Sequence, residues 1–502
     1  MEAWSRRKQE RSWFVKFEVC SRPSSTPFTS IAFSRNATLA ALGVCEYVSC
    51  AIQYLLQTPA ISSLLVLRRA ASVGAFVGKM EMGPTTTTAV LLCCLCLAAQ
   101  LHGGAAVTSG TSDGTELWGY ITVRPGAMMF WWWYKSPQRV SSPAKPWPTI
   151  LWLQGGPGGS SVGRGNFQEI GPLDVDLKPR NSTWLQMADL IFVDSPVGVG
   201  YSYVKNSSAL ATTDTQAAKD VVELIKAVVK EIPTLQSSPL YLVGESYGGK
   251  LAAIIGVSVA RSIRAGSLNL TLGGVVLGNS WISPADFAQS YPWLLHSMSR
   301  LDDNAVPTAI RMGITVNQQM AAGQFSPAYE TWTDLLNLTN ARSGQVNVEN
   351  IMIDNTISQI PSNEIMNGVI RKKLIIIPVD VMWQQVSLSV FDSINKDFMR
   401  PAIKEVDELL AYGVNVTVYN GQLDVICSTI GAESWLKKLN LPRRTLTYCP
   451  PYDQAKAFVR SYKNLQFYWI LGAGHNVPVN QPCVAMHMIG DIVQSPAPAS
   501  MA

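Results

Sequence analysis

Charged side chains are scarce in this sequence, and the positive ones are gathered at its start. Charged residues make up 15% of the 502 residues, and the formal net charge is +5. The first 79 residues hold ten Lys or Arg and four acids, a balance of +6, so the remaining residues sum to −1. A chain body this close to neutral gives no indication of the basic surface on which nucleic-acid binding depends. We therefore expect no nucleic-acid partner.

Cysteine and histidine are also in short supply. Beyond residue 106 the cysteines are Cys427, Cys449 and Cys483. Three thiols cannot form the disulfide framework of a small secreted domain; at most one bridge can join two of them, and the sequence does not decide which two. They form no Cys-x-x-Cys pair and no His cluster accompanies them, so no metal site is indicated. We expect neither a metal nor another cofactor.

Long uninterrupted apolar runs are missing as well. Residues 51–67 are apolar but broken by polar residues, and a membrane helix needs about 20 mostly apolar residues, so we expect no membrane span. Residues 89–99 form a shorter apolar run followed by small residues, which is typical of a secretory signal peptide. We expect residues 80–106 to be this signal segment, with Met80 or Met82 as the initiator. Residues 1–79 would then be a non-native or disordered extension; the alternative is a signal anchor.

Acceptor sequences for N-glycosylation support a secretory route. The pattern Asn-x-Ser/Thr occurs five times after the signal-like segment. Each match alone is weak evidence, but five together favour a secreted or lysosomal protein. The expected acceptors are Asn181, Asn206, Asn269, Asn337 and Asn415.

The rest of the chain alternates between short apolar runs and helical patterns. Residues 213–231, for example, place apolar side chains at helical spacing. This alternation predicts an α/β fold, a mostly parallel central sheet with helices on both faces. Residues 285–400 predict a helical cap over the carboxyl edge of the sheet, inserted between core segments 107–284 and 401–502. The expected strands are residues 149–154, 190–194, 240–243, 274–278, 414–420 and 465–471.

One apolar run leads into the sequence Gly-Glu-Ser-Tyr-Gly, residues 244–248, and a helical pattern follows it. A strand, a sharp turn and a helix with a serine at the tip form the nucleophile elbow of an α/β-hydrolase, so Ser246 is the candidate nucleophile. We expect Gly244 and Gly248 to let neighbouring backbone pass close and to adopt unusual dihedral angles. The pattern also occurs by chance in ordinary strand-to-helix turns, so it needs partners elsewhere.

Of the four histidines, His475 lies where a catalytic base would be expected. It follows an apolar run, in a glycine-containing loop at residues 472–478. His296, in the expected cap, and His487, in a helical pattern, are interpreted as structural. Hydrolases carry the acid between the nucleophile and the histidine along the chain, and Asp424 has this position after another apolar run. Its alternative role is that of an ordinary turn aspartate.

A glycine-rich segment, residues 155–159, follows the first strong strand pattern. In hydrolases such a loop gives one backbone N–H to the oxyanion hole, and the residue after the nucleophile gives the other. These donors would be Gly156 and Tyr247. A phosphate-binding loop is the rival interpretation, but no Lys-Ser/Thr pair follows the glycines.

Together these segments resemble the serine carboxypeptidase family. The resemblance extends from about residue 118 to the C terminus and includes residues 152–159, 192–198 and 244–249, the Asp424 loop and Gly474-His475. Residues 169–173, 278–284 and 420–424 are similar to the retinoid-inducible branch of that family. The resemblance implies that Ser246 attacks the last peptide bond of a peptide or protein substrate and that the acyl-enzyme is then hydrolysed.

The resemblance also implies a site for the free C-terminal carboxylate of the substrate. Its members would be Trp152, Gln154, Gly155 and Glu245. A glutamate beside a carboxylate must be protonated to donate a hydrogen bond, because two like charges in contact are costly. We therefore expect an acidic optimum.

This chain departs from the family pattern in ways that keep other functions open. Gln154 stands where many members have asparagine. Ser246 and Asp424 are 178 residues apart and Asp424 and His475 are 51 apart, both shorter than we expect, with shortfalls near residues 342–363 and 440–456. A weakly active or non-catalytic interaction protein and an acyltransferase are the alternatives. The sequence leaves open whether the chain forms a homodimer.

Overall fold

The computed structural model describes residues 106–140, 145–353, 363–437, 445–448 and 455–494. All of these belong to the second of two units into which the chain divides, Gly104–Ala502. The expected extension and the expected signal segment up to residue 105 lie outside the described residues. Much of the two stretches expected to be short lies outside them too, so none of these expectations is tested.

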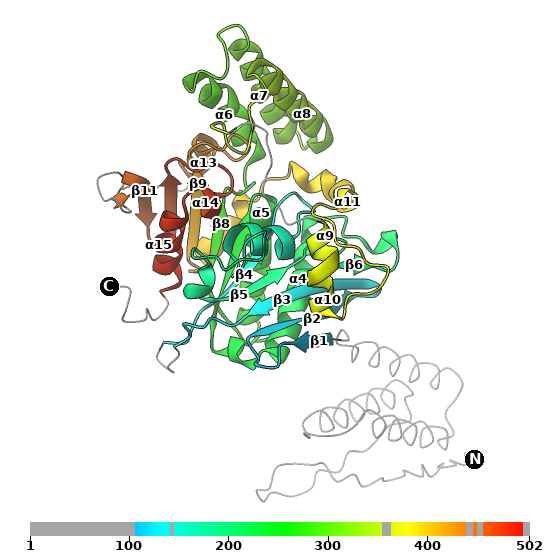
Figure 1. Cartoon of the computed structure of the whole chain (residues 1–502). Helices are drawn as coiled ribbons and strands as arrows, with labels where there is room; N and C mark the ends of the chain where they lie inside the picture. The colour runs from blue at the N-terminus through cyan, green and yellow to red at the C-terminus, as the bar shows by residue number, and fades with distance from the viewer. Residues whose placement is uncertain (1–105, 141–144, 354–362, 438–444, 449–454, 495–502) are drawn as a thin grey trace, which may run out of the picture. The chain divides into compact units, whose positions relative to one another are not determined.

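A twelve-stranded sheet forms the centre of the second unit (Figure 1). Its order is β1-β2-β3-β5-β4-β7-β8-β9-β12-β11-β10, with β6 paired to β3. The strands from β5 to β12 in this order are parallel to one another, and antiparallel pairs close both edges. The strands are β1 Ala106–Gly110, β2 Glu116–Arg124, β3 Ala127–Tyr134, β4 Thr149–Leu153, β5 Asp189–Val193, β6 Tyr203–Val204, β7 Pro239–Glu245, β8 Thr271–Gly278, β9 Val416–Gly421, β10 Thr445–Tyr448, β11 Ala455–Tyr462 and β12 Leu465–Ile470.

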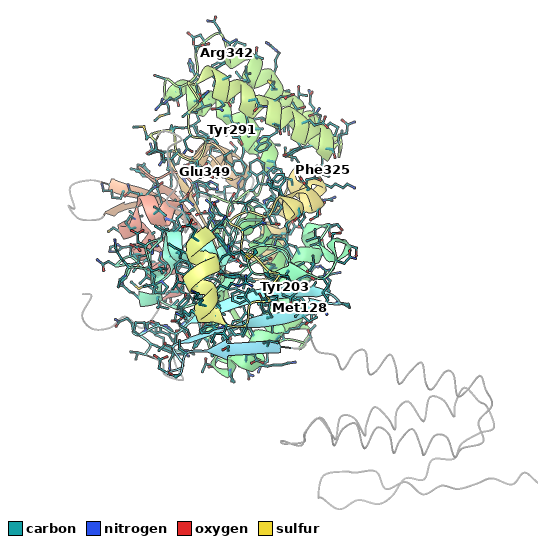
Figure 2. The ribbon with its side chains drawn as sticks, turned by 45° about the vertical axis from the view of Figure 1, so that its right-hand side comes forward. Met128, Tyr203, Tyr291, Phe325, Arg342 and Glu349 are labelled. Carbon is teal, nitrogen blue, oxygen red and sulfur yellow. The ribbon has the colours of Figure 1, made fainter. Side chains whose placement is uncertain are left out.

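The parallel part of the sheet agrees with the sequence, whereas several edge strands were not predicted. Each of the six expected strands overlaps a strand of the structure. The sequence patterns did not indicate β1, β2, β3, β6, β10 or β11. At one of these edges Met128 of β3 lies opposite Tyr203 of β6 (Figure 2).

Alternate side chains along each central strand enter two hydrophobic cores. On β4, Leu151 and Leu153 face the first core, whereas Ile150 and Trp152 face the second. The first core is completed by helices that include α4, α5 and α12, and the second by η1 and α15. Helices therefore cover both faces, as the alternation of patterns predicts. Their bounds are η1 Ser161–Ile170, a π-helix, α4 Asp214–Glu231, α5 Tyr247–Arg264, α12 Ile403–Ala411, α13 Thr429–Leu436, α14 Val477–Asn480 and α15 Pro482–Val493.

Between β8 and β9 the described chain is helical. Helices α7 and α8 pack against each other, and Figure 1 shows them with α6 in green above the sheet. Tyr291 of α6 connects this cap to the core, because its hydroxyl donates to the carbonyl oxygen of Ile426 at 3.0 Å. The helices of this region are α6 Pro284–Ser297, α7 Val306–Ala321, α8 Phe325–Arg342, α9 Asn363–Ile365, η5 Met366–Ile370, α10 Arg371–Leu374 and α11 Leu388–Phe398; the remaining short turns are η2 Trp184–Gln186, η3 Ser207–Ala209 and η4 Pro233–Gln236.

Candidate active site

The serine between β7 and α5 carries the backbone strain of the turn. Ser246 has φ 59° and ψ −126°, and positive φ is uncommon for residues other than glycine. Such a conformation costs on the order of 1–3 kcal/mol and persists where the surrounding structure enforces it. Here the enforcing elements are a buried strand and the buried first turn of a helix, which leave the serine at the carboxyl edge of the sheet.

The two glycines of the turn do not carry its positive φ. Neither Gly244 nor Gly248 has a positive φ, whereas Ser246 between them does. The prediction of close passage is confirmed. A Cβ at position 244 would lie 2.2 Å from the carbonyl oxygen of Gly248, and one at 248 would lie 2.1 Å from that of Leu153. A side chain at either position would therefore displace backbone beside the serine.

Asp424 and His475 meet at the ends of neighbouring parallel strands, β9 and β12. Oδ2 of Asp424 lies 2.7 Å from Nδ1 of His475, and both residues are buried. The same Oδ2 accepts a hydrogen bond from Nδ2 of Asn279 at 2.6 Å, and Oδ1 accepts one from the N–H of Cys427 at 3.1 Å. Both carboxylate oxygens are thus satisfied, and the contact at Nδ1 leaves Nε2 as the histidine nitrogen able to accept a proton.

The surroundings of His475 favour the protonated imidazole. Burial alone would lower the pKa of this histidine. The charge of Asp424 and the hydrogen bond to it outweigh burial, so the pKa lies above its ordinary value of 6.5. The loop is fixed by a 2.7 Å hydrogen bond from the N–H of His475 to the carbonyl oxygen of Glu349.

Residues adjacent to Ser246 and His475 join the two loops that carry them. Among the described residues no hydrogen bond links Ser246 directly to His475, and such bonds are often long before substrate arrives. Glu245, just before the serine, accepts a 3.0 Å hydrogen bond through Oε1 from Nδ2 of Asn476, just after the histidine. This hydrogen bond therefore joins the residue before the serine to the residue after the histidine.

The glycine-rich loop after β4 packs directly against the serine. A Cβ at Gly155 would lie 2.5 Å from Cβ of Ser246, and Gly156 has φ +123°, which favours glycine. In the described part of the chain, neither the N–H of Gly156 nor that of Tyr247 donates a hydrogen bond. Two free donors beside a serine are the arrangement that an oxyanion hole requires.

Next to the serine lies a buried group that we call the acid–amide cluster: Gln154, Glu169, Glu245 and Asn476. Nε2 of Gln154 donates to Oε1 of Glu169 at 3.1 Å and to Oε1 of Glu245 at 3.0 Å. Nδ2 of Asn476 reaches the same two oxygens, at 3.4 and 3.0 Å. Two carboxyl groups therefore share two amide donors.

The acid–amide cluster has unused acceptors and an unusual proton affinity. Oε2 of Glu169 and Oε2 of Glu245 are both buried, and neither accepts a hydrogen bond from a donor among the described residues; the two carboxyl groups are close enough to bond each other when one is protonated. Burial raises the pKa of Glu245 well above its ordinary value of 4.5, and the charge of Glu169 raises it further. The cluster is therefore prone to hold a proton, and a protonated carboxyl group can donate where an ionised one cannot.

The four residues expected to bind a carboxylate all lie near the serine, but they do not all belong to the acid–amide cluster. Gln154 and Glu245 belong to the acid–amide cluster, and Gly155 lies against the serine. Trp152 is fully buried, and its indole N–H donates to Oε1 of Gln154 at 2.8 Å. This bond turns the NH₂ group of Gln154 toward the two glutamates, so Trp152 acts on the site through Gln154.

Sequence reasoning missed three polar residues of the site: Glu169, Asn279 and Asn476. The first two lie inside segments noted for their resemblance to the family, and the third follows the candidate base. Each is a buried or partly buried polar residue beside a glycine-containing motif. That position is the signal that could have found them.

Other candidate groups lie apart from this chemistry. His296 is half exposed and pairs with Asp303 at 2.9 Å, in keeping with a structural role. Cys483 takes part in a disulfide, whereas Cys427 is a buried free thiol whose pKa burial raises. Asp424, Cys427 and His475 lie close enough together to ligate a metal ion, but the carboxylate of Asp424 and the imidazole of His475 already bind each other.

One property of the helices bears on membrane association. Within the described ranges, no helix combines the length and the apolar character needed to cross a bilayer.

Comparison with known proteins assigns the chain to a family. A sequence model described as serine carboxypeptidase matches residues 107–495. Serine carboxypeptidase-like 51 of Arabidopsis thaliana is 47% identical over 82% of this chain and 99% of its own length. The retinoid-inducible serine carboxypeptidase of Homo sapiens is 41% identical, over 78% of this chain and 95% of its own length.

The fold has a counterpart among solved structures. KEX1(delta)p, a prohormone-processing carboxypeptidase from Saccharomyces cerevisiae, superposes with a TM-score of 0.65 at 20% identity, over 76% of this chain and 91% of that one. At this identity the likeness speaks for the α/β-hydrolase fold alone. On the strength of the match over residues 107–495 and of relatives above 40% identity, this chain belongs to the serine carboxypeptidase family, the serine-type carboxypeptidases of the hydrolase class.

Proposed function

We propose that Ser246, His475 and Asp424 form the catalytic triad of this carboxypeptidase. Oγ of Ser246 attacks the carbonyl carbon of the last peptide bond, and its proton passes to Nε2 of His475. Asp424 holds the imidazole in the required tautomer and stabilises the imidazolium, which the raised pKa of His475 supports. The N–H groups of Gly156 and Tyr247 stabilise the oxyanion. The protonated histidine then gives its proton to the departing amine, and water hydrolyses the acyl-enzyme.

The acid–amide cluster binds the free carboxylate of the last residue. The observation that carries this assignment is the pair of buried, unpartnered oxygens, Oε2 of Glu169 and Oε2 of Glu245. A carboxylate arriving between them accepts a hydrogen bond from whichever glutamate holds the proton. Gln154, oriented by Trp152, holds the two glutamates in place, and the backbone of Gly155 borders the site. The cluster thus restricts the enzyme to chain ends.

Binding of this kind favours acidic conditions. The raised pKa of Glu245 keeps a proton in the cluster to a higher pH than an ordinary glutamate would allow. Once that proton is lost, two ionised glutamates face an ionised substrate and repel it. Affinity for substrates is therefore highest at acidic pH and declines as the pH rises through the pKa of Glu245.

A secretory destination, secreted or lysosomal, agrees with this chemistry. The five asparagines of the glycosylation patterns, Asn181, Asn206, Asn269, Asn337 and Asn415, are all exposed, which supports their use as acceptors.

Two measurements on the secreted chain test the proposal. A fluorophosphonate probe should label the wild type and not Ser246→Ala, which establishes a reactive nucleophile. An N-terminally blocked peptide should then lose single residues from its C terminus, whereas the same peptide ending in an amide should be resistant. Labelling without release would favour the weakly active or acyltransferase alternatives, absence of labelling would favour the non-catalytic one, and equal cleavage of acid and amide would contradict carboxylate recognition.

A further inference from the structure

Arg164 is a partly buried cation that has no partner among the described residues. It lies in the π-helix η1, and its Nε is buried and makes no hydrogen bond. No ion pair or side-chain hydrogen bond joins its guanidinium to any residue in the described part of the chain. Arginine keeps its charge at every physiological pH, so the charge is present even without a partner. A guanidinium held in this state is available to a ligand.

The neighbours of Arg164 place it beside the acid–amide cluster. A Cβ at Gly165 would lie 2.3 Å from Nε1 of Trp152 and 3.2 Å from Oε1 of Gln154. On its other side, a Cβ at Gly163 would lie 2.2 Å from the ring of Trp383. The backbone of η1 is therefore pressed against the pair that orients the cluster, and η1 also contacts α14, the short helix after His475.

The charge of Arg164 reaches both parts of the site. It acts against protonation of Glu245 and of His475, which places the guanidinium near each of them. Among the described residues, neither Glu245 nor another acid forms an ion pair with it. Glu169 and Glu245 accept hydrogen bonds from Gln154 and Asn476. The charge of Glu349, whose carbonyl oxygen accepts from the N–H of His475, acts on Glu245 and His475. The fold therefore provides a cation near the cluster and does not neutralise it.

We propose that Arg164 selects substrates whose C-terminal residue is acidic. The inference rests on the proposed function: with the terminal carboxylate in the acid–amide cluster and the last peptide bond at Ser246, the side chain of the last residue lies close to both. An aspartate or glutamate there presents a second carboxylate, which the planar guanidinium can bind through two parallel N–H···O bonds. A neutral side chain of the same size forms weaker bonds and leaves the charge unmatched.

The test compares two blocked peptides that differ only in ending with glutamate or glutamine. At about pH 5.5 the glutamate side chain is mostly ionised, so the pair differs in charge and hardly in size. We expect the wild type to favour the glutamate peptide about tenfold to a hundredfold in kcat/KM, the range of a hydrogen-bonded charge pair. In Arg164→Gln this ratio should fall close to one, and Arg164→Glu should favour a peptide ending in lysine instead.

Arg342→Gln serves as the matched control. Arg342 is exposed at the end of α8, at the top of the cap in Figure 2, and its removal changes the net charge equally. It should leave the ratio at the wild-type value, and thermal melting checks that each variant is folded.

Two results would overturn the inference. A wild-type ratio near one would do so without any variant. An Arg164→Gln enzyme that loses equal activity on both peptides would show that Arg164 serves the terminal carboxylate or the fold, not the side chain. Neither result argues against recognition of the terminal carboxylate, which is tested separately by the resistance of the amidated peptide.

Discussion

The two ends of the active site use buried acids in opposite ways. At one end, Asp424 faces a histidine, and both of its oxygens have donors. At the other end, Glu169 and Glu245 face each other, and each keeps one buried oxygen that no donor among the described residues reaches. The first pair combines an acid with a base and is complete without substrate. The second combines two groups of the same charge and needs a proton or a ligand to be satisfied.

This difference separates the two tasks of the enzyme. Both His475 and Glu245 have a raised pKa, but for different reasons: an adjacent negative charge stabilises the imidazolium, whereas burial and a second acid penalise the carboxylate. The Asp–His end is therefore built to stabilise a charge that appears during reaction. The Glu–Glu end disfavours a negative charge, which suits the carboxylate binding proposed for it.

The largest effect is expected from removing the charge of Asp424, at the end where both carboxylate oxygens have donors. Asp424→Asn keeps the size of the side chain but favours the wrong histidine tautomer, so kcat should fall on the order of 10⁴-fold while KM changes little. Steady-state kinetics on a blocked peptide measure this. The exposed Asp334→Asn in α8 should match the wild type. A variant of Asp424 that loses affinity instead of turnover would contradict the division of tasks.

The next largest effect concerns Glu245 in the acid–amide cluster. Glu245→Gln cannot ionise, so the rise of KM between pH 4.5 and 7.5 should shrink by about tenfold or more, the equivalent of one unit of pKa. KM is measured across that range for the wild type, for Glu245→Gln and for the exposed control Glu330→Gln of α8. An unchanged pH profile in Glu245→Gln would remove this glutamate from carboxylate binding.

A smaller effect is expected from deleting one of the hydrogen bonds that Asp424 accepts. Asn279→Ala deletes one donor to Oδ2 of Asp424 and leaves the carboxylate with fewer hydrogen bonds. The loss of one such bond is worth about 1 kcal/mol, so kcat should fall about fivefold. The exposed Asn340→Ala is the control. A loss as large as that of Asp424→Asn would mean that Asn279 holds the whole loop.

The smallest effect is on stability. Glu245 and His475 both have a raised pKa in the folded state, so each contributes stability that is full below its unfolded value and is lost as the pH rises through its folded value. Asp189 and Asp194, with pKa values of about 6, act in the same direction up to that pH. The melting temperature should therefore decline by a few degrees from pH 6 to 8, and less in Glu245→Gln. A decline equal in both proteins would argue against a raised pKa at Glu245.

The sequence predicted the parts of the fold that depend on local patterns. Ser246, Asp424 and His475 each follow an apolar run that becomes a central parallel strand, so their position at one edge could be foreseen. Strand β3 could not be, because residues 127–134 are apolar without alternation and are buried on both faces of the sheet. The pairing of Glu169 with Glu245 joins residues 76 apart, and no pattern along the chain encodes such a contact.

The hydrogen bond between Glu245 and Asn476 couples the two tasks proposed for the site, recognition of the chain end and cleavage of the last peptide bond. Glu245 is adjacent to Ser246, and its partner Asn476 is adjacent to His475. A movement of the Glu245 carboxyl group, when it gains a proton or a ligand, therefore acts next to both the nucleophile and the base. For a peptide without a free C-terminal carboxylate, Ser246 and His475 would therefore be less well aligned, and the peptide would also bind less tightly. Selectivity in such an enzyme appears in turnover as well as in affinity.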